Sequence, residues 1–116
     1  MSYDYREAMR NDIREWLKEN GETVTEANRD DIYDRLWVAD SVTGNASGSY
    51  TFSTWQAEEN IAHNWDLLAE AMTEFGAGDE NVIEKGAEWC DVTIRCYLLG
   101  EILGEFVTDE EESEND

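Results

Sequence analysis

Four acidic residues have the types and spacing of a metal-dependent site that hydrolyses phosphate bonds. Glu58 and Glu59 are adjacent, and Glu88 and Asp91 lie three positions apart in a later segment. Carboxylates at positions i and i+3 share one face of a helix, so two facing helices could hold all four around Mg²⁺. A metal ion held in this way would position a water for attack on a nucleotide phosphate.

This pattern resembles that of the MazG-like, all-α nucleoside triphosphate pyrophosphohydrolases, in which EExxE is followed at a distance by ExxD. The matching stretches are "EENIAHNW" and "EWCDVTIRCYLLGEILG", in the C-terminal half of the chain. The resemblance implies that Glu58, Glu59, Glu88 and Asp91 bind the metal. The third glutamate of the pattern is replaced by Ala62, so one ligand is missing.

The same acidic residues also have a structural interpretation, which we favour over a metal site. Asp91 and Arg95 are four positions apart and can form an ion pair along a helix, and Glu88 lies on the same side. A charged residue on a buried helix requires such a partner, because an unpaired buried charge is strongly destabilising.

No other residues form a complete catalytic set. His63 is the single histidine; with Glu59 and Asp66 it could coordinate a divalent cation, but a solvated surface histidine is the favoured interpretation. Cys90 and Cys96 are six positions apart, on different faces of a helix, and we expect both to be reduced core residues. We therefore predict a protein without enzymatic activity, bound metal or cofactor.

The spacing of apolar residues predicts one all-α domain over residues 1–107. Helices are expected at about 3–20, 28–40, 54–75 and 87–107, with a short helix after Asp79. The last long helix is apolar on most sides, so we expect a compact bundle of four to five helices around a buried C-terminal helix. The run "DEEESEND" predicts a disordered acidic tail over residues 108–116.

The segment "TGNASGSYTF", residues 43–52, is the richest in small polar residues. We predict a structured connection in which Gly44 and Gly48 permit tight turns, with short extended pieces at Val42 and at 50–52. Phe52 is expected to pack on the core. Two other residues of this segment, Asn45 and Tyr50, are candidate loop contacts with a partner.

The net charge of −21 makes an anionic ligand or membrane surface an unfavourable partner, so direct binding to nucleic acid is not expected. The negative charge is concentrated after residue 35, where 19 acidic residues accompany 2 basic ones. No apolar run has the length of a membrane span, and the N-terminal sequence lacks the apolar core of a signal peptide. We expect a cytoplasmic protein, inside a bacterial host cell.

On a single helix over 54–75, acidic residues would form a stripe opposite the apolar face of Ile61, Trp65 and Leu68. Neighbours on a helix face are about 5–6 Å apart, a spacing comparable with that of successive phosphates. Salt-adapted proteins are also acidic, but over every face. We therefore predict a partner-binding acidic surface comprising Glu59, Asp66, Glu70, Glu74, Glu101, Glu105, Asp109, Glu110, Glu111 and Glu112.

In length, helical character, aromatic content and acidic tail, the chain resembles the small acidic anti-defence proteins of phages and mobile elements, the Ocr-type anti-restriction and anti-CRISPR inhibitors that mimic DNA. The stretches "LWVADSVTGNASGSYTFSTWQAEENIAHNWDLLAEAMTEFG" and "AEWCDVTIRCYLLG" are similar to a family from mobile elements of gut bacteria. These resemblances imply an inhibitor that occupies the nucleic-acid groove of a DNA- or RNA-binding defence nuclease. The alternatives are a degenerate pyrophosphohydrolase and a non-enzymatic helical adaptor that dimerises through exposed tryptophans.

Overall fold

The helices expected from apolar spacing are present in the computed structural model, which describes residues 4–48, 50, 53–74 and 86–108. No strand occurs in these ranges, so the all-α prediction is confirmed. The predicted short helix after Asp79 and the tail residues 109–116 lie outside them. The helices are α1 (Tyr5–Asn20), α2 (Arg29–Trp37), α3 (Thr54–Ala62), α4 (Trp65–Glu74) and α6 (Ala87–Phe106).

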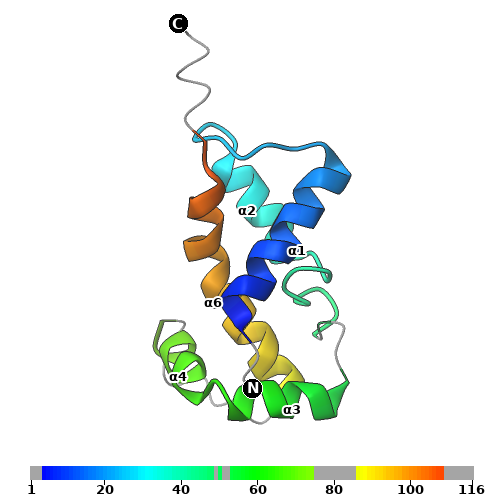
Figure 1. Ribbon diagram of the computed structural model, residues 1–116, viewed down its shortest axis with the longest axis vertical. Helices are drawn as coiled ribbons and strands as arrows, with labels where there is room; N and C mark the ends of the chain where they lie inside the picture. Colours follow the sequence, from blue (N-terminus) through cyan, green and yellow to red (C-terminus); the bar gives the residue numbers. More distant parts are fainter. Residues whose placement is uncertain (1–3, 49, 51–52, 75–85, 109–116) are drawn as a thin grey trace, which may run out of the picture.

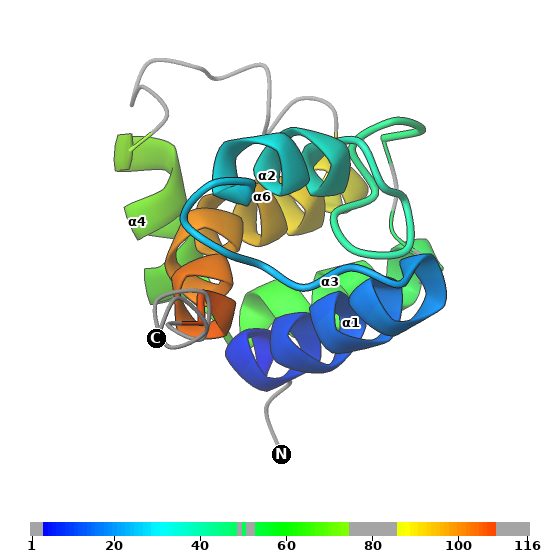
Figure 2. The same cartoon turned by 90° about the horizontal axis from the view of Figure 1, so that it is seen from above.

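Helix α6 is the centre of the bundle, as predicted. It packs against α1, α2, α3 and α4, and residues from Cys90 to Leu103 are buried on nearly every side of it. Figure 1 shows α3 and α4 at the end where α6 begins, and α2 beside its later turns. Viewed along the long axis, α1 and α2 lie on different sides of α6 (Figure 2). The α3–α4 segment therefore forms one end of the molecule.

Helix α1 follows directly from the sequence. Its residues at four-residue intervals, from Tyr5 through Met9 and Ile13, are buried. Asp4 caps the first turn by accepting a hydrogen bond from the backbone N–H of Glu7, at 3.1 Å. Gly21 ends the helix with φ of 63°, a left-handed conformation that glycine adopts without steric cost.

Helix α2 begins after Asn28, as predicted, but ends at Trp37 and not near residue 40. The chain turns because the carbonyl of Ala39 accepts backbone N–H groups of Val42 and Thr43, at 2.9 and 2.8 Å. The Thr43 hydroxyl donates to the Trp37 carbonyl at 2.9 Å, so a loop side chain satisfies the helix end. Val42 is fully buried in this turn, which corrects the extended piece predicted there.

The predicted single helix over 54–75 is two helices, α3 and α4, separated at His63 and Asn64. The Asn64 side chain donates to the Asn60 carbonyl at 2.9 Å, and its own carbonyl accepts the N–H groups of Leu67 and Leu68, at 3.0 and 3.1 Å. Asn64 thus closes one helix and begins the next, because asparagine competes well for backbone groups at helix ends. Figure 1 shows α4 turning away from the line of α3, so the predicted stripe is not continuous.

Candidate acidic interface

The α3–α4 segment carries acidic residues without a basic residue of its own. Between Ser53 and Glu74 there are five acidic residues and no Lys or Arg. All five are exposed, and within the described residues no Lys or Arg forms an ion pair with any of them. We call this set the α3–α4 carboxylates: Glu58, Glu59, Asp66, Glu70 and Glu74.

Two tryptophans stand exposed on the same two helices. Trp55 on α3 is 65 % exposed and Trp65 on α4 is 61 % exposed, although Ile61 and Leu68 beside them are buried. Trp65 was predicted to join the core face; that prediction was wrong, because the break at Asn64 rotates α4 relative to α3. Large exposed aromatic side chains are typical of protein-binding surfaces. The adaptor alternative required exposed tryptophans, but sequence spacing did not identify which ones.

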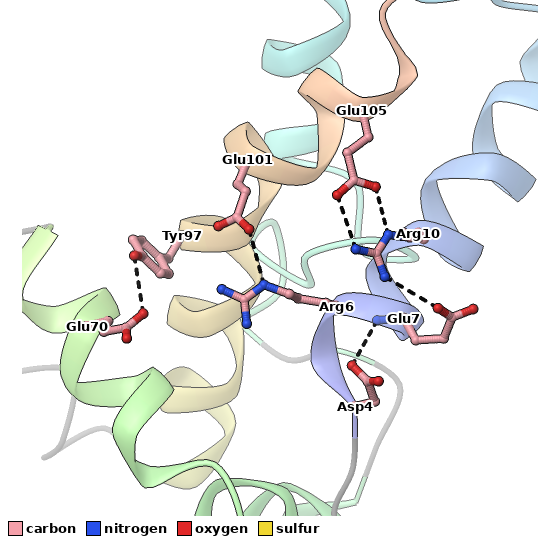
Figure 3. Close-up of polar contacts among 8 residues, drawn as sticks. All are labelled: Asp4, Arg6, Glu7, Arg10, Glu70, Tyr97, Glu101 and Glu105. Carbon is pink, nitrogen blue, oxygen red and sulfur yellow. Dashed lines mark hydrogen bonds and ion pairs between the residues drawn. The ribbon is translucent and has the colours of Figure 1, made fainter.

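Glu101 and Glu105, predicted to face a partner, instead pair with α1 (Figure 3). Arg6 Nε lies 3.1 Å from Glu101, and Arg10 Nε lies 2.7 Å from Glu105. The hydrogen bond from Arg10 holds the pKa of the Glu105 carboxyl below its usual range. These two acids join α1 to α6 and remain exposed, so each already has a basic partner while its assignment to the partner surface stays a prediction. Arg6 and Arg10 of α1 thus form ion pairs across to α6, and Arg10 also lies 3.4 Å from Glu7 of its own helix.

Glu70 lies where the α3–α4 carboxylates approach α6. Its carboxylate accepts a hydrogen bond from the Tyr97 hydroxyl at 3.4 Å, as Figure 3 shows. Desolvation raises the pKa of Tyr97, and the charges of Glu70, Glu101 and Glu74 raise it further. Three carboxylates, those of Glu70, Glu101 and Glu74, thus act on Tyr97 in addition to desolvation.

The four residues of the pyrophosphohydrolase pattern are not brought together. Glu58 and Glu59 are exposed on α3, whereas Glu88 accepts a hydrogen bond from the Thr54 hydroxyl at 2.8 Å. Asp91 is buried and bonded to Arg95 Nε at 2.9 Å, which confirms the predicted structural ion pair. No group of three or more His, Cys, Asp or Glu within the described ranges could hold a metal ion.

Arg95 is fully buried, and its guanidinium is enclosed by aromatic rings. It lies 5.1 Å from the ring centre of Tyr5 and 3.6 Å from that of Tyr50. The Tyr5 hydroxyl donates to Asp91, and that of Tyr50 donates to Asp12. Burial raises the pKa of Asp12, although the Tyr50 hydrogen bond and the Arg95 charge oppose the rise.

Tyr50 has a structural contact that the sequence did not predict. Its half-buried ring packs on the Arg95 guanidinium, and its predicted contact with a partner stays a prediction. Asn45, the other predicted loop contact, is half-buried, and its backbone N–H donates to the Thr43 hydroxyl at 3.1 Å. The loop is therefore held from within by Thr43 and Tyr50.

The two cysteines are buried and form no disulfide, as predicted. Burial raises the pKa of Cys96 to about 12, although a hydrogen bond with Thr43 opposes the rise, and burial also raises the pKa of Cys90. Since the thiolate is the reactive form, iodoacetamide should label both residues far more slowly in the folded protein than in urea. Cys90 lines a surface groove, so we expect it to react before Cys96. Peptide mapping of the labelled protein measures this order, and faster labelling of Cys96 would contradict it.

The predicted tail carboxylates Asp109, Glu110, Glu111 and Glu112 lie outside the described residues. Thr108, predicted as the first tail residue, donates its backbone N–H to the Val24 carbonyl at 3.1 Å. None of the helices within the described residues has the length and apolar character needed to cross a membrane. No family model, curated protein or solved structure matches the chain.

Proposed function

We propose that this protein is an acidic inhibitor that mimics DNA and occupies the nucleic-acid groove of a bacterial defence nuclease, either a restriction enzyme or a CRISPR effector. The observation that carries this proposal is the set of α3–α4 carboxylates, which are exposed and have no Lys or Arg partner within the described residues. Elsewhere in the bundle, arginines of α1 and α2 neutralise several acids. The negative charge at the α3–α4 end is therefore available to a basic partner.

The physical basis is the same as that of DNA binding. Proteins that bind duplex DNA neutralise its phosphates with Lys and Arg, and the released counterions make binding strongly dependent on salt. Carboxylates on helices α3 and α4 present negative charge on rigid elements, so a basic groove gains the same counterion release. The inhibitor would act from the cytoplasm of the host cell, without binding nucleic acid itself.

We propose a revised set of residues for this surface. Glu58 enters the set, because it is exposed on α3 beside Glu59. Glu101 and Glu105 leave it, because each is paired with an arginine of α1. Trp55 and Trp65 add aromatic side chains that a mimic of phosphate charge alone would not require, and they supply apolar contact area within the same surface.

Neutralising all five α3–α4 carboxylates, as Glu→Gln and Asp→Asn, should abolish inhibition. We expect at least a hundredfold more protein for half-inhibition, since roughly five phosphate-like contacts are lost, each contributing to the salt-dependent part of binding. The measurement is DNA cleavage by a type I restriction enzyme and by a DNA-cleaving CRISPR effector, with increasing amounts of inhibitor. Helical circular dichroism should be unchanged.

A matched control carries five neutralised acids on other parts of the surface. These residues are exposed on α1, on α2 and in the turn between them: Glu15, Glu19, Glu26, Asp30 and Asp34. The control has the same net charge as the first variant, so it separates the position of the charge from its amount. Equal loss of inhibition in both variants would contradict the assignment of the surface to α3 and α4. Wild-type inhibition by the variant with neutralised α3–α4 carboxylates would also reject this assignment.

A further inference from the structure

A small apolar groove opens between α3, α4 and the first turn of α6. Its volume is about 290 Å³, and its apolar lining comprises Ile61, Ala62, Trp65, Leu68, Ala87 and Cys90. Glu58 is the charged residue among the described residues that line it. This volume is at the lower limit of the about 300–1,000 Å³ of small-molecule sites, so the groove fits one or two apolar side chains better than a cofactor.

Acidic residues line both the groove and the pocket next to it, and Trp65 lies between the two. Trp65 and Ala62 also line a second, polar pocket of about 490 Å³, which contains Asp66 and Glu70. Arg6 and His63 are the basic residues among the described residues of that pocket. Arg6 Nε is already 3.1 Å from Glu101, and His63 Nε2 lies 3.7 Å from Glu59. An occupant of the groove would therefore have carboxylates within reach beside its apolar contact.

We propose that this groove binds an amphipathic basic segment of the partner protein, with one apolar side chain against Trp65 and Leu68 and flanking Lys or Arg side chains on the α3–α4 carboxylates. This inference rests on the proposed function, because it names the part of the partner that the same surface contacts. Charge decides the occupant: a second copy of this chain would place the same carboxylates against one another, and such like-charge contacts are unfavourable.

The two parts of the contact respond differently to salt. Ion pairs between exposed groups weaken as ionic strength rises, whereas burial of apolar surface does not. A pure charge mimic would lose nearly all affinity at high salt. A partner segment anchored in the groove should retain part of its affinity.

Two synthetic helical peptides with equal numbers of Lys test the groove directly. One carries a stripe of Leu at i, i+4 and i+7; in the other, Ser replaces each Leu. We expect the Leu peptide to bind the full-length protein at least about tenfold more tightly by fluorescence anisotropy, because a Leu side chain buries apolar surface in the groove. It should also slow iodoacetamide labelling of Cys90, which lines the groove.

The matched variants are Ala62→Leu, which fills the groove, and Ala69→Leu, which places the same side chain on the exposed surface of α4 outside it. Neither substitution changes the net charge of the protein, and each replaces one residue of good helix propensity with another. Ala62→Leu should remove the preference for the Leu peptide, while Ala69→Leu should retain it. The salt dependence of the remaining binding should be the same in both.

Several results would overturn the groove assignment. Equal binding of the two peptides would show that charge alone acts, and binding of neither would show that the groove is not available to a partner. A concentration-dependent dimer of the wild type in sedimentation, lost in Ala62→Leu, would assign the groove to a second copy. The peptide assay contains no nuclease, so it tests the groove independently of inhibition. If the protein selects the Leu peptide but does not inhibit a nuclease, only the proposed function is rejected. If it inhibits a nuclease but does not select the Leu peptide, only the groove assignment is rejected.

Discussion

Replacing Arg95 with Met should lower the free energy of unfolding by about 3–5 kcal/mol, because removing one partner of a buried ion pair leaves the other charge uncompensated. Arg95 is fully buried, and its Nε bonds Asp91, which is 2 % exposed. Its guanidinium also fills the space between the rings of Tyr5 and Tyr50. The substitution therefore removes the charge partner of Asp91 and the cation on which both rings pack.

Urea denaturation measures this effect, and two further variants interpret it. Arg6→Met removes an arginine whose ion pair with Glu101 is exposed, and should cost about 0–1 kcal/mol. Replacing both members of the buried pair, as Arg95→Met with Asp91→Leu, should recover part of the loss, because the fully buried carboxylate is removed together with its partner. Recovery should be incomplete, since Asp12 still loses its ion pair with Arg95. A loss below about 1 kcal/mol in Arg95→Met would show that the pair is not a main stabilising contact.

Gly48→Ala should destabilise the protein by about 2–5 kcal/mol, from backbone strain and overpacking together. Gly48 has φ of 85°, which residues with a Cβ rarely adopt. A Cβ at this position would lie 2.5 Å from Cζ2 of Trp89, closer than any normal contact. The loop can therefore pack on α6 only because residue 48 has no side chain.

Gly21→Ala is the matched control for backbone strain. Gly21 has φ of 63°, but a Cβ there would meet nothing within 4 Å, so the cost should be about 1–2 kcal/mol. In a Trp89→Leu background the steric part disappears, and Gly48→Ala should then cost no more than Gly21→Ala. Thermal or urea unfolding of the wild type, the two glycine variants, Trp89→Leu and the double variant measures these costs. Equal costs for the two glycine substitutions in the wild-type background would contradict the close packing of Gly48 on Trp89.

Local features of the fold could be predicted from the sequence, because their causes are local. Asn28 precedes α2, Gly21 ends α1, and Ser53 caps α3 by accepting the N–H of Gln56 at 3.2 Å. The apolar character of α6 on most sides predicted its central position, since such a helix must be surrounded. The Asp91–Arg95 pair was also predictable, because its four-residue spacing is a property of one helix.

The candidate surface was predicted less well, because it depends on contacts between helices. An asparagine inside a helical pattern does not show whether it lies within the helix or ends it, so the break at Asn64 was missed, and with it the exposure of Trp65. The ion pairs of Glu101 and Glu105 could not be predicted, because their arginines lie 95 residues away in the sequence. Likewise, nothing adjacent to Tyr50 indicates that it covers Arg95.

Capture of a partner from bacterial lysate tests the proposed inhibition most directly. The tagged wild-type protein and the two five-site variants are incubated with lysate at about 50 and 200 mM salt, a range over which phosphate-like contacts lose most of their affinity. The account predicts a nuclease or another nucleic-acid-binding protein that the wild type and the control variant retain at low salt. Most of that protein should be released by high salt and by duplex DNA, and it should not bind when the α3–α4 carboxylates are neutralised. Retention of the same proteins by the neutralised variant, or capture of none that DNA displaces, would contradict DNA mimicry.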